Sequence, residues 1–68
     1  MKFGTNVYVL RGSNSIPIAD RRFVNAKYVG ARGGKVAVKL TVNDDLANTA
    51  PTKRGEIGWF GRNSVVLR

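Results

Sequence analysis

The clearest pattern in the chain is the alternation of apolar and polar positions between residues 35 and 42. A period of two residues is typical of a strand with one buried and one solvated face. The pattern therefore predicts a strand over 35–42. The residues expected to be buried are Val36, Val38, Leu40 and Val42, and those expected to face solvent are Lys35, Ala37, Lys39 and Thr41.

A second strand is predicted just before this one, because residues 23–29 are rich in β-branched and aromatic side chains. The dipeptide Gly33-Gly34 lies between the two segments and suits a two-residue hairpin turn. With these glycines as the loop, Tyr28 lies opposite Lys39. Cross-strand partners share one face of a sheet, so Tyr28 and Lys39 are expected to point outward together.

Three further segments have strand character and are separated by residues that favour turns. They are residues 5–10, 56–60 and 64–67. The piece 16–22 contains a proline, which cannot donate to a ladder, so it is expected to be a loop or at most an edge strand. Residues 43–51 are expected to form either one helical turn capped by Asn43 or a long loop.

Five short strands in 68 residues, without an amphipathic helix, indicate an all-β chain that forms a small five-stranded antiparallel barrel. An SH3-like barrel and an OB-fold both fit this description. OB-folds are usually longer and carry a helix between the third and fourth strands, so the length favours the SH3-like barrel. A chain this short buries only about 60% of the surface that its unfolded form exposes, so residues 1–68 are expected to form one domain.

The C-terminal segment 55–67, GEIGWFGRNSVVL, resembles the end of an SH3 domain, whose usual pattern is G-x-x-G-W/L-F/I-P-x-N-Y-V. Gly61 stands at the position of the groove proline and Ser64 at that of the groove tyrosine. The resemblance implies an SH3-like fold without the proline-peptide groove. It points to the wider class with KOW, Tudor and other bacterial and phage modules that bind nucleic acid or proteins. It also implies that Phe60 is buried and Trp59 half-exposed.

Charge is the strongest functional signal, because 12 Lys and Arg residues oppose 4 Asp and Glu residues and give a net charge of +8. Such a surplus suits a polyanion, whose phosphates are neutralised by lysine and arginine, while an exposed ring can stack on an unpaired base. The candidate nucleic-acid-binding residues are Tyr28, Arg32, Lys35 and Lys39 on the hairpin, and Arg21, Arg22, Lys53 and Arg54 in the loops. Trp59 is a candidate aromatic contact or a lid over the end of the barrel. The alternative role of the hairpin charges is to keep a solvated sheet face from pairing with other chains.

The chain contains neither Cys nor His, so disulfides, the usual zinc ligand sets and the familiar hydrolytic triads are excluded. We therefore expect no enzyme, no cofactor and no metal. The pair Asp44-Asp45 lacks the spacing of a calcium loop and suits a turn, and Asp20 and Glu56 are expected to form surface ion pairs. No apolar run is long enough to span a bilayer, so a soluble, cytoplasmic protein is expected.

Two functions remain after these exclusions. The leading hypothesis is a small basic protein that binds DNA or RNA, mostly without sequence specificity, as a phage or bacterial accessory factor. The alternative is a protein-interaction module that docks on an acidic surface of a larger protein such as a polymerase or nuclease, because the same charge would steer that encounter.

Overall fold

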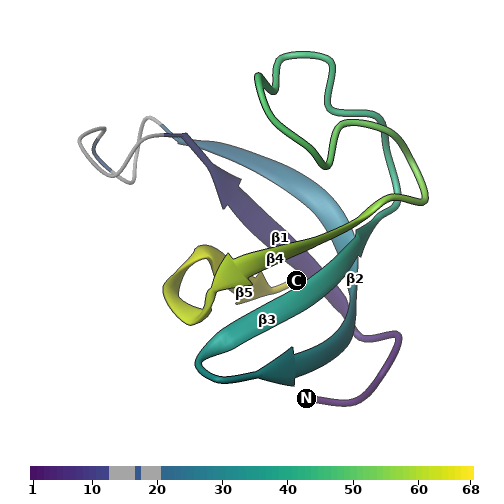
Figure 1. Cartoon of the computed structure of the whole chain (residues 1–68), viewed down its shortest axis with the longest axis vertical. Helices are drawn as coiled ribbons and strands as arrows, with labels where there is room; N and C mark the ends of the chain where they lie inside the picture. Colours follow the sequence, from purple (N-terminus) through teal and green to yellow (C-terminus); the bar gives the residue numbers. More distant parts are fainter. Residues whose placement is uncertain (13–16, 18–20) are drawn as a thin grey trace.

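The structure is a computed structural model that describes residues 1–12, Pro17 and residues 21–68. Five antiparallel strands form one sheet in the order β4-β3-β2-β1-β5 (Figure 1). The strands are β1 (Asn6–Arg11), β2 (Arg22–Arg32), β3 (Lys35–Leu40), β4 (Ile57–Gly61) and β5 (Val65–Leu67), and a 3-10 turn, η2 (Arg62–Ser64), joins β4 to β5. The prediction of an all-β chain with five strands is confirmed, and no α-helix occurs in the part that the structure describes.

The sheet curls around one apolar core, which gives a small barrel-like fold (Figure 1). The long strand β2 makes this possible because it pairs with β1 along its first half and with β3 along its second half. The core consists of Val7, Val9, Val24, Ala26, Val36, Val38 and Leu40. The predicted alternation on β3 is confirmed for its valines and leucine, but Ala37 is buried too, and Val42 is exposed because it lies beyond the end of the strand.

The hairpin between β2 and β3 has the predicted turn. Arg32 lies opposite Lys35, and Gly33 and Gly34 have φ angles of 57° and 80°. Only glycine adopts such angles readily, so the dipeptide fixes the position of the turn.

The predicted register fails further along this hairpin, because a β-bulge lies between Tyr28 and Gly30. The extra residue places Tyr28 opposite the buried Val38 instead of Lys39, and Lys27 takes the position opposite Lys39. Tyr28 packs against the core. The expectation that Tyr28 points outward with Lys39 is therefore wrong, since a shift of one residue moves a side chain to the other face of the sheet.

The connection 41–56 forms a loop over one end of the sheet and contains no helix, so the loop alternative is correct (Figure 1). In the piece 16–22, Arg22 already belongs to β2 and Pro17 belongs to no strand. The predictions for Ile16 and for residues 18–20, including Asp20, lie outside the described residues. Within those described, no helix has the length and apolar character needed to cross a membrane.

Candidate functional site

The outward-facing side of β2, β3 and β4, called here the outer face, is built from three rows of residues that the strand register aligns. The rows are Lys27–Lys39–Ile57, Gly30–Ala37–Trp59 and Arg32–Lys35–Gly61. Successive rows are two residues apart along β3 and β4, which corresponds to about 7 Å, while the bulge separates Lys27 from Gly30 on β2 by three positions. The middle row therefore lies between two rows that carry positive charge.

The middle row exposes a large aromatic ring beside very small residues. Trp59 is 55% exposed, whereas Phe60 turns inward and packs against the core, so the predicted orientation of both side chains is confirmed. Next to Trp59, Ala37 is only 5% exposed, and no heavy atom outside Gly30 and its two chain neighbours lies within 4 Å of the position that a Cβ on Gly30 would occupy. The result is a shallow groove of about 460 Å³ whose walls include Trp59 and Phe3.

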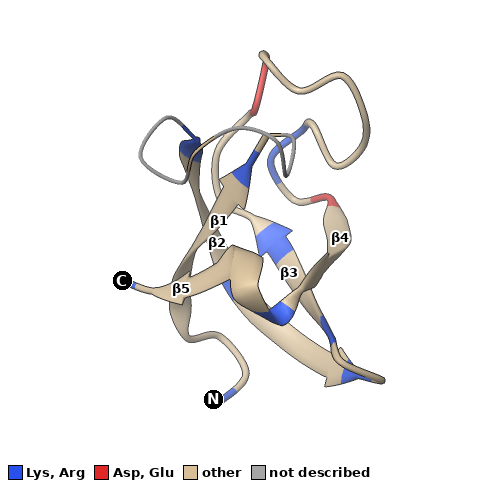
Figure 2. Cartoon of the chain, turned by 90° about the vertical axis from the view of Figure 1, so that its left-hand side faces the viewer, with Lys and Arg blue, Asp and Glu red and all other residues tan. Residues whose placement is uncertain are grey.

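The basic residues of the outer rows are exposed and have no acidic partner in the described chain. Lys27 lies opposite Lys39, and Arg32 lies opposite Lys35. All described Asp and Glu residues lie in the connection 41–56 (Figure 2). The ion pairs found there join Asp44 to Arg11 and Arg22. Like charges directly opposite each other destabilise a sheet, and here their positive charge is not compensated by a described carboxylate.

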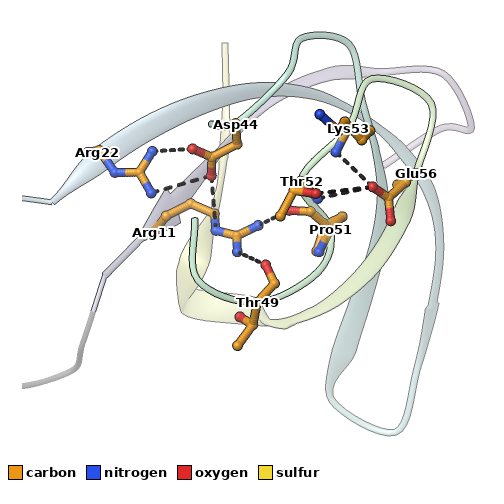
Figure 3. Close-up of polar contacts among 8 residues, drawn as sticks. All are labelled: Arg11, Arg22, Asp44, Thr49, Pro51, Thr52, Lys53 and Glu56. Carbon is orange, nitrogen blue, oxygen red and sulfur yellow. Dashed lines mark hydrogen bonds and ion pairs between the residues drawn. The ribbon is translucent and has the colours of Figure 1, made fainter. Parts of the chain in front are cut away.

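A different group of charges lies at the end of the sheet beneath the loop 41–56, where Arg11 and Asp44 are buried and Arg22 is half-buried (Figure 3). We call Arg11, Arg22 and Asp44 the buried charge cluster. The guanidinium of Arg22 donates to the carboxylate of Asp44, and Arg11 Nε lies 3.4 Å from Asp44 Oδ2. The Asp44 side chain is only 1% exposed. Arg22, a candidate phosphate contact in the sequence, is thus held by a carboxylate within the fold.

Arg11 also ties the loop to the sheet. Its Nη1 donates to the carbonyl of Pro51 at 2.9 Å, and its Nη2 donates to the carbonyl of Thr49 at 3.0 Å (Figure 3). Its guanidinium also lies 5.3 Å from the centre of the Phe60 ring. Sequence reasoning missed this role. The signal was available, because Arg11 continues the inward-facing positions Val7 and Val9 at a spacing of two.

The other predicted basic residues divide between the outer face and its surroundings. Arg54 lines a hollow together with Lys27 and Lys39, so it extends the outer face toward the loop. Lys53 is exposed in the adjacent turn, and Arg21 lies half-buried just before β2. Of the predicted hairpin residues, Arg32, Lys35 and Lys39 share the outer face, whereas Tyr28 does not.

Glu56 has a structural role in place of the expected surface ion pair. Its Oε1 accepts hydrogen bonds from the backbone N–H groups of Lys53 at 2.8 Å and Thr52 at 3.3 Å. These donors stabilise the carboxylate and hold the pKa of Glu56 below its ordinary value of 4.5.

No group of His, Cys, Asp and Glu residues suited to a metal ion occurs among the residues described.

Lys27, Phe3 and Ile57 complete the outer face and were not predicted as site residues. The bulge explains the omission of Lys27, because the uninterrupted register would have placed it opposite the buried Leu40.

Comparisons of the chain with protein families, with curated proteins and with solved structures give no match.

Proposed function

We propose that this protein binds nucleic acid, DNA or RNA, through the outer face of β2, β3 and β4. The observation that carries the proposal is the exposed ring of Trp59 between two rows of basic residues that have no acidic partner in the described chain. Phosphates neutralise such cations and release counterions, and the ring offers a surface for a base. The resemblance of residues 55–67 to an SH3-like barrel agrees with this class of function.

Recognition in this proposal depends mostly on the phosphate backbone. Lysine and arginine side chains that contact phosphates carry no sequence information, and an aromatic face stacks on every base. The protein is therefore expected to bind many sequences with similar affinity. Arg54 and Lys53 lie next to the rows and add positive charge at one end.

The test is a fluorescence-polarisation titration with labelled oligonucleotides at several salt concentrations. Each phosphate contact contributes a slope of about −0.7 to −0.9 to the plot of log K against log salt. The double variant Lys27→Gln/Lys39→Gln should lose about two contacts' worth of slope. The variant Arg62→Gln/Arg68→Gln removes the same charge from η2 and the C-terminal residue and should keep the slope. Absence of binding at low salt would refute the proposal.

The alternative partner is an acidic protein surface, and exposed apolar residues on the same face suit it. Ile57 is 58% exposed and Phe3 is 79% exposed, beside Lys39. This alternative predicts no oligonucleotide binding. It also predicts nuclease-resistant association with one acidic protein, which the double variant should weaken.

A further inference from the structure

We propose that the groove beside Trp59 receives a single unpaired base, so that the outer face prefers single-stranded nucleic acid to duplex. This inference rests on the proposed function and adds the class of ligand to it. It starts from the shape of the groove. Trp59 and Phe3 belong to its lining together with Gly30, Ala31 and Ala37, whose side chains are too small to fill the space.

The lining of the groove combines apolar side chains with two cations, so a suitable ligand should have both an apolar surface and negative charge. Trp59 and Phe3 present exposed rings, and Arg32 and Lys39 also belong to the lining of the groove. A nucleobase has a flat face for ring stacking and polar edges that stay in water. An aliphatic side chain would fill the same space but would bring no charge to meet the cations.

The positions of the two basic rows match the connectivity of a nucleotide chain. The rows lie about 7 Å on either side of the middle row. In a nucleic-acid strand, every internal nucleotide has a phosphate on its 5′ side and another on its 3′ side. A base stacked on Trp59 would therefore direct one phosphate toward Arg32 and Lys35 and the other toward Lys27 and Lys39.

The location of Trp59 on the sheet explains why the base should be unpaired. Trp59 lies in the middle row of a three-stranded face and not at the Gly33-Gly34 turn that ends the hairpin. Bases in a duplex stack on their neighbours, and extruding one from the stack is energetically unfavourable. A duplex can therefore make only phosphate contacts with this face. A flexible single strand can make the same contacts and can also stack one base on Trp59.

The fluorescence of Trp59 reports on this groove directly, because it is the only tryptophan of the chain. We suggest titrating the protein with oligothymidylate, with a duplex, and with an abasic oligomer of the same length and charge as the oligothymidylate. Oligothymidylate should change the Trp59 emission and bind about 5- to 150-fold more tightly than the abasic oligomer, as expected for one stacked base. Emission that stays constant while oligothymidylate binds with the same affinity as the abasic oligomer would overturn the inference.

Variants separate stacking from charge. Trp59→Ala should weaken binding of oligothymidylate about 5- to 150-fold and leave the abasic oligomer and the duplex nearly unchanged. Phe3→Ala should show the same selectivity with a smaller loss. Phe23→Ala is the matched control. Phe23 is 54% exposed, close to the 55% of Trp59, but it packs against Tyr8 and does not line the groove. Circular dichroism checks that each variant is folded.

The outcomes distinguish this inference from the proposed function. Equal losses for all three ligands in Trp59→Ala would reject the base-binding groove, while salt-dependent binding would still support nucleic-acid recognition by the cations. No binding of any oligonucleotide would reject both. Binding of only an acidic protein, sensitive to Trp59→Ala, would reject both and assign the groove to a protein partner.

Discussion

Arg11 and Arg22 lie opposite each other on β1 and β2, just as Lys27 and Lys39 do on β2 and β3. Both are cross-strand pairs of like charge, which are unfavourable by themselves. At the first pair, Asp44 reaches in from the loop and contacts both arginines. At the second pair, no carboxylate of the described chain is present.

The two pairs also differ in burial, most clearly at Arg11, because the side chain of Arg22 is still 36% exposed. Arg11 is 8% exposed and has hydrogen-bond partners from the loop in addition to Asp44, whereas Lys27 and Lys39 are exposed to water. A buried charge needs a partner inside the protein, while an exposed one is stabilised by solvent until an external anion arrives. The comparison therefore assigns the arginine pair to the fold and supports a binding role for the lysine pair.

Removal of Asp44 is expected to have the largest effect. In Asp44→Ala, Arg11 stays buried without a counterion, which costs about 3–5 kcal/mol. A small domain without disulfides has a total stability of only about 3–5 kcal/mol, so the variant should be largely unfolded at 25 °C. Urea denaturation followed by circular dichroism measures this. Asp45→Ala is the control, because the neighbouring Asp45 is exposed. Equal stability of the two variants would show that the cluster does not hold the fold.

Gly58→Ala tests whether the two regions behave independently. A Cβ at Gly58 would lie 2.5 Å from Cδ of Pro51, whose carbonyl accepts from Arg11. Relief of this clash should cost about 1–3 kcal/mol in the free energy of unfolding. Gly61→Ala is the control, because that position is open and has φ −61° and ψ 151°.

The binding measurement completes this test. Gly58 faces the core, whereas its neighbour Trp59 faces outward. Folded Gly58→Ala protein should therefore bind oligonucleotides with unchanged affinity. A loss of affinity larger than the loss of folded protein would mean that the two regions are coupled.

The strands were predictable because their patterns are local. Alternation on β3 and the paired glycines of the turn define the hairpin. The facing of Trp59 and Phe60 on β4 was implied by the resemblance of residues 55–67 to the end of an SH3 domain. The bulge at Val29 was not predictable, because an inserted residue in a strand leaves the local composition unchanged. It nevertheless decides which residues form the site, since it replaces Tyr28 by Lys27 on the outer face.

The buried charge cluster was only partly predictable. The inward facing of Arg11 follows from its spacing to Val7 and Val9. Its partner Asp44, however, lies far along the chain, after both β2 and β3. A loop residue has no periodicity that fixes its direction. Only the tertiary structure shows that Asp44 turns inward while Asp45 stays in solvent.

The variant Glu56→Gln is expected to change the free energy of unfolding by less than the two variants above, and its effect should depend on pH in the acidic range. Its pKa in the folded protein is lowered by the N–H groups of Lys53 and Thr52, so the unfolded chain binds a proton more readily. The stability from this carboxylate is therefore present above its ordinary pKa of 4.5 and is lost as the pH falls through the folded pKa. The stability difference between the wild-type chain and Glu56→Gln should shrink between pH 7 and pH 3. A difference independent of pH would contradict this role.

Replacement of Lys39 is expected to have the smallest effect and the opposite sign. Lys39→Gln removes one charge of the uncompensated pair with Lys27 and should stabilise the free protein by about 0.2–1 kcal/mol at low salt. The gain should decline at about 1 M salt, where the screening length is about 3 Å. Arg62→Gln lowers the net charge equally but lies in η2, without a cross-strand partner, so it isolates the local repulsion. Since Lys39 is also a proposed phosphate contact, the same variant should bind oligonucleotides more weakly while being more stable. Lower stability together with weaker binding would instead indicate that Lys39 supports the fold, and the contrast with the arginine pair would then disappear.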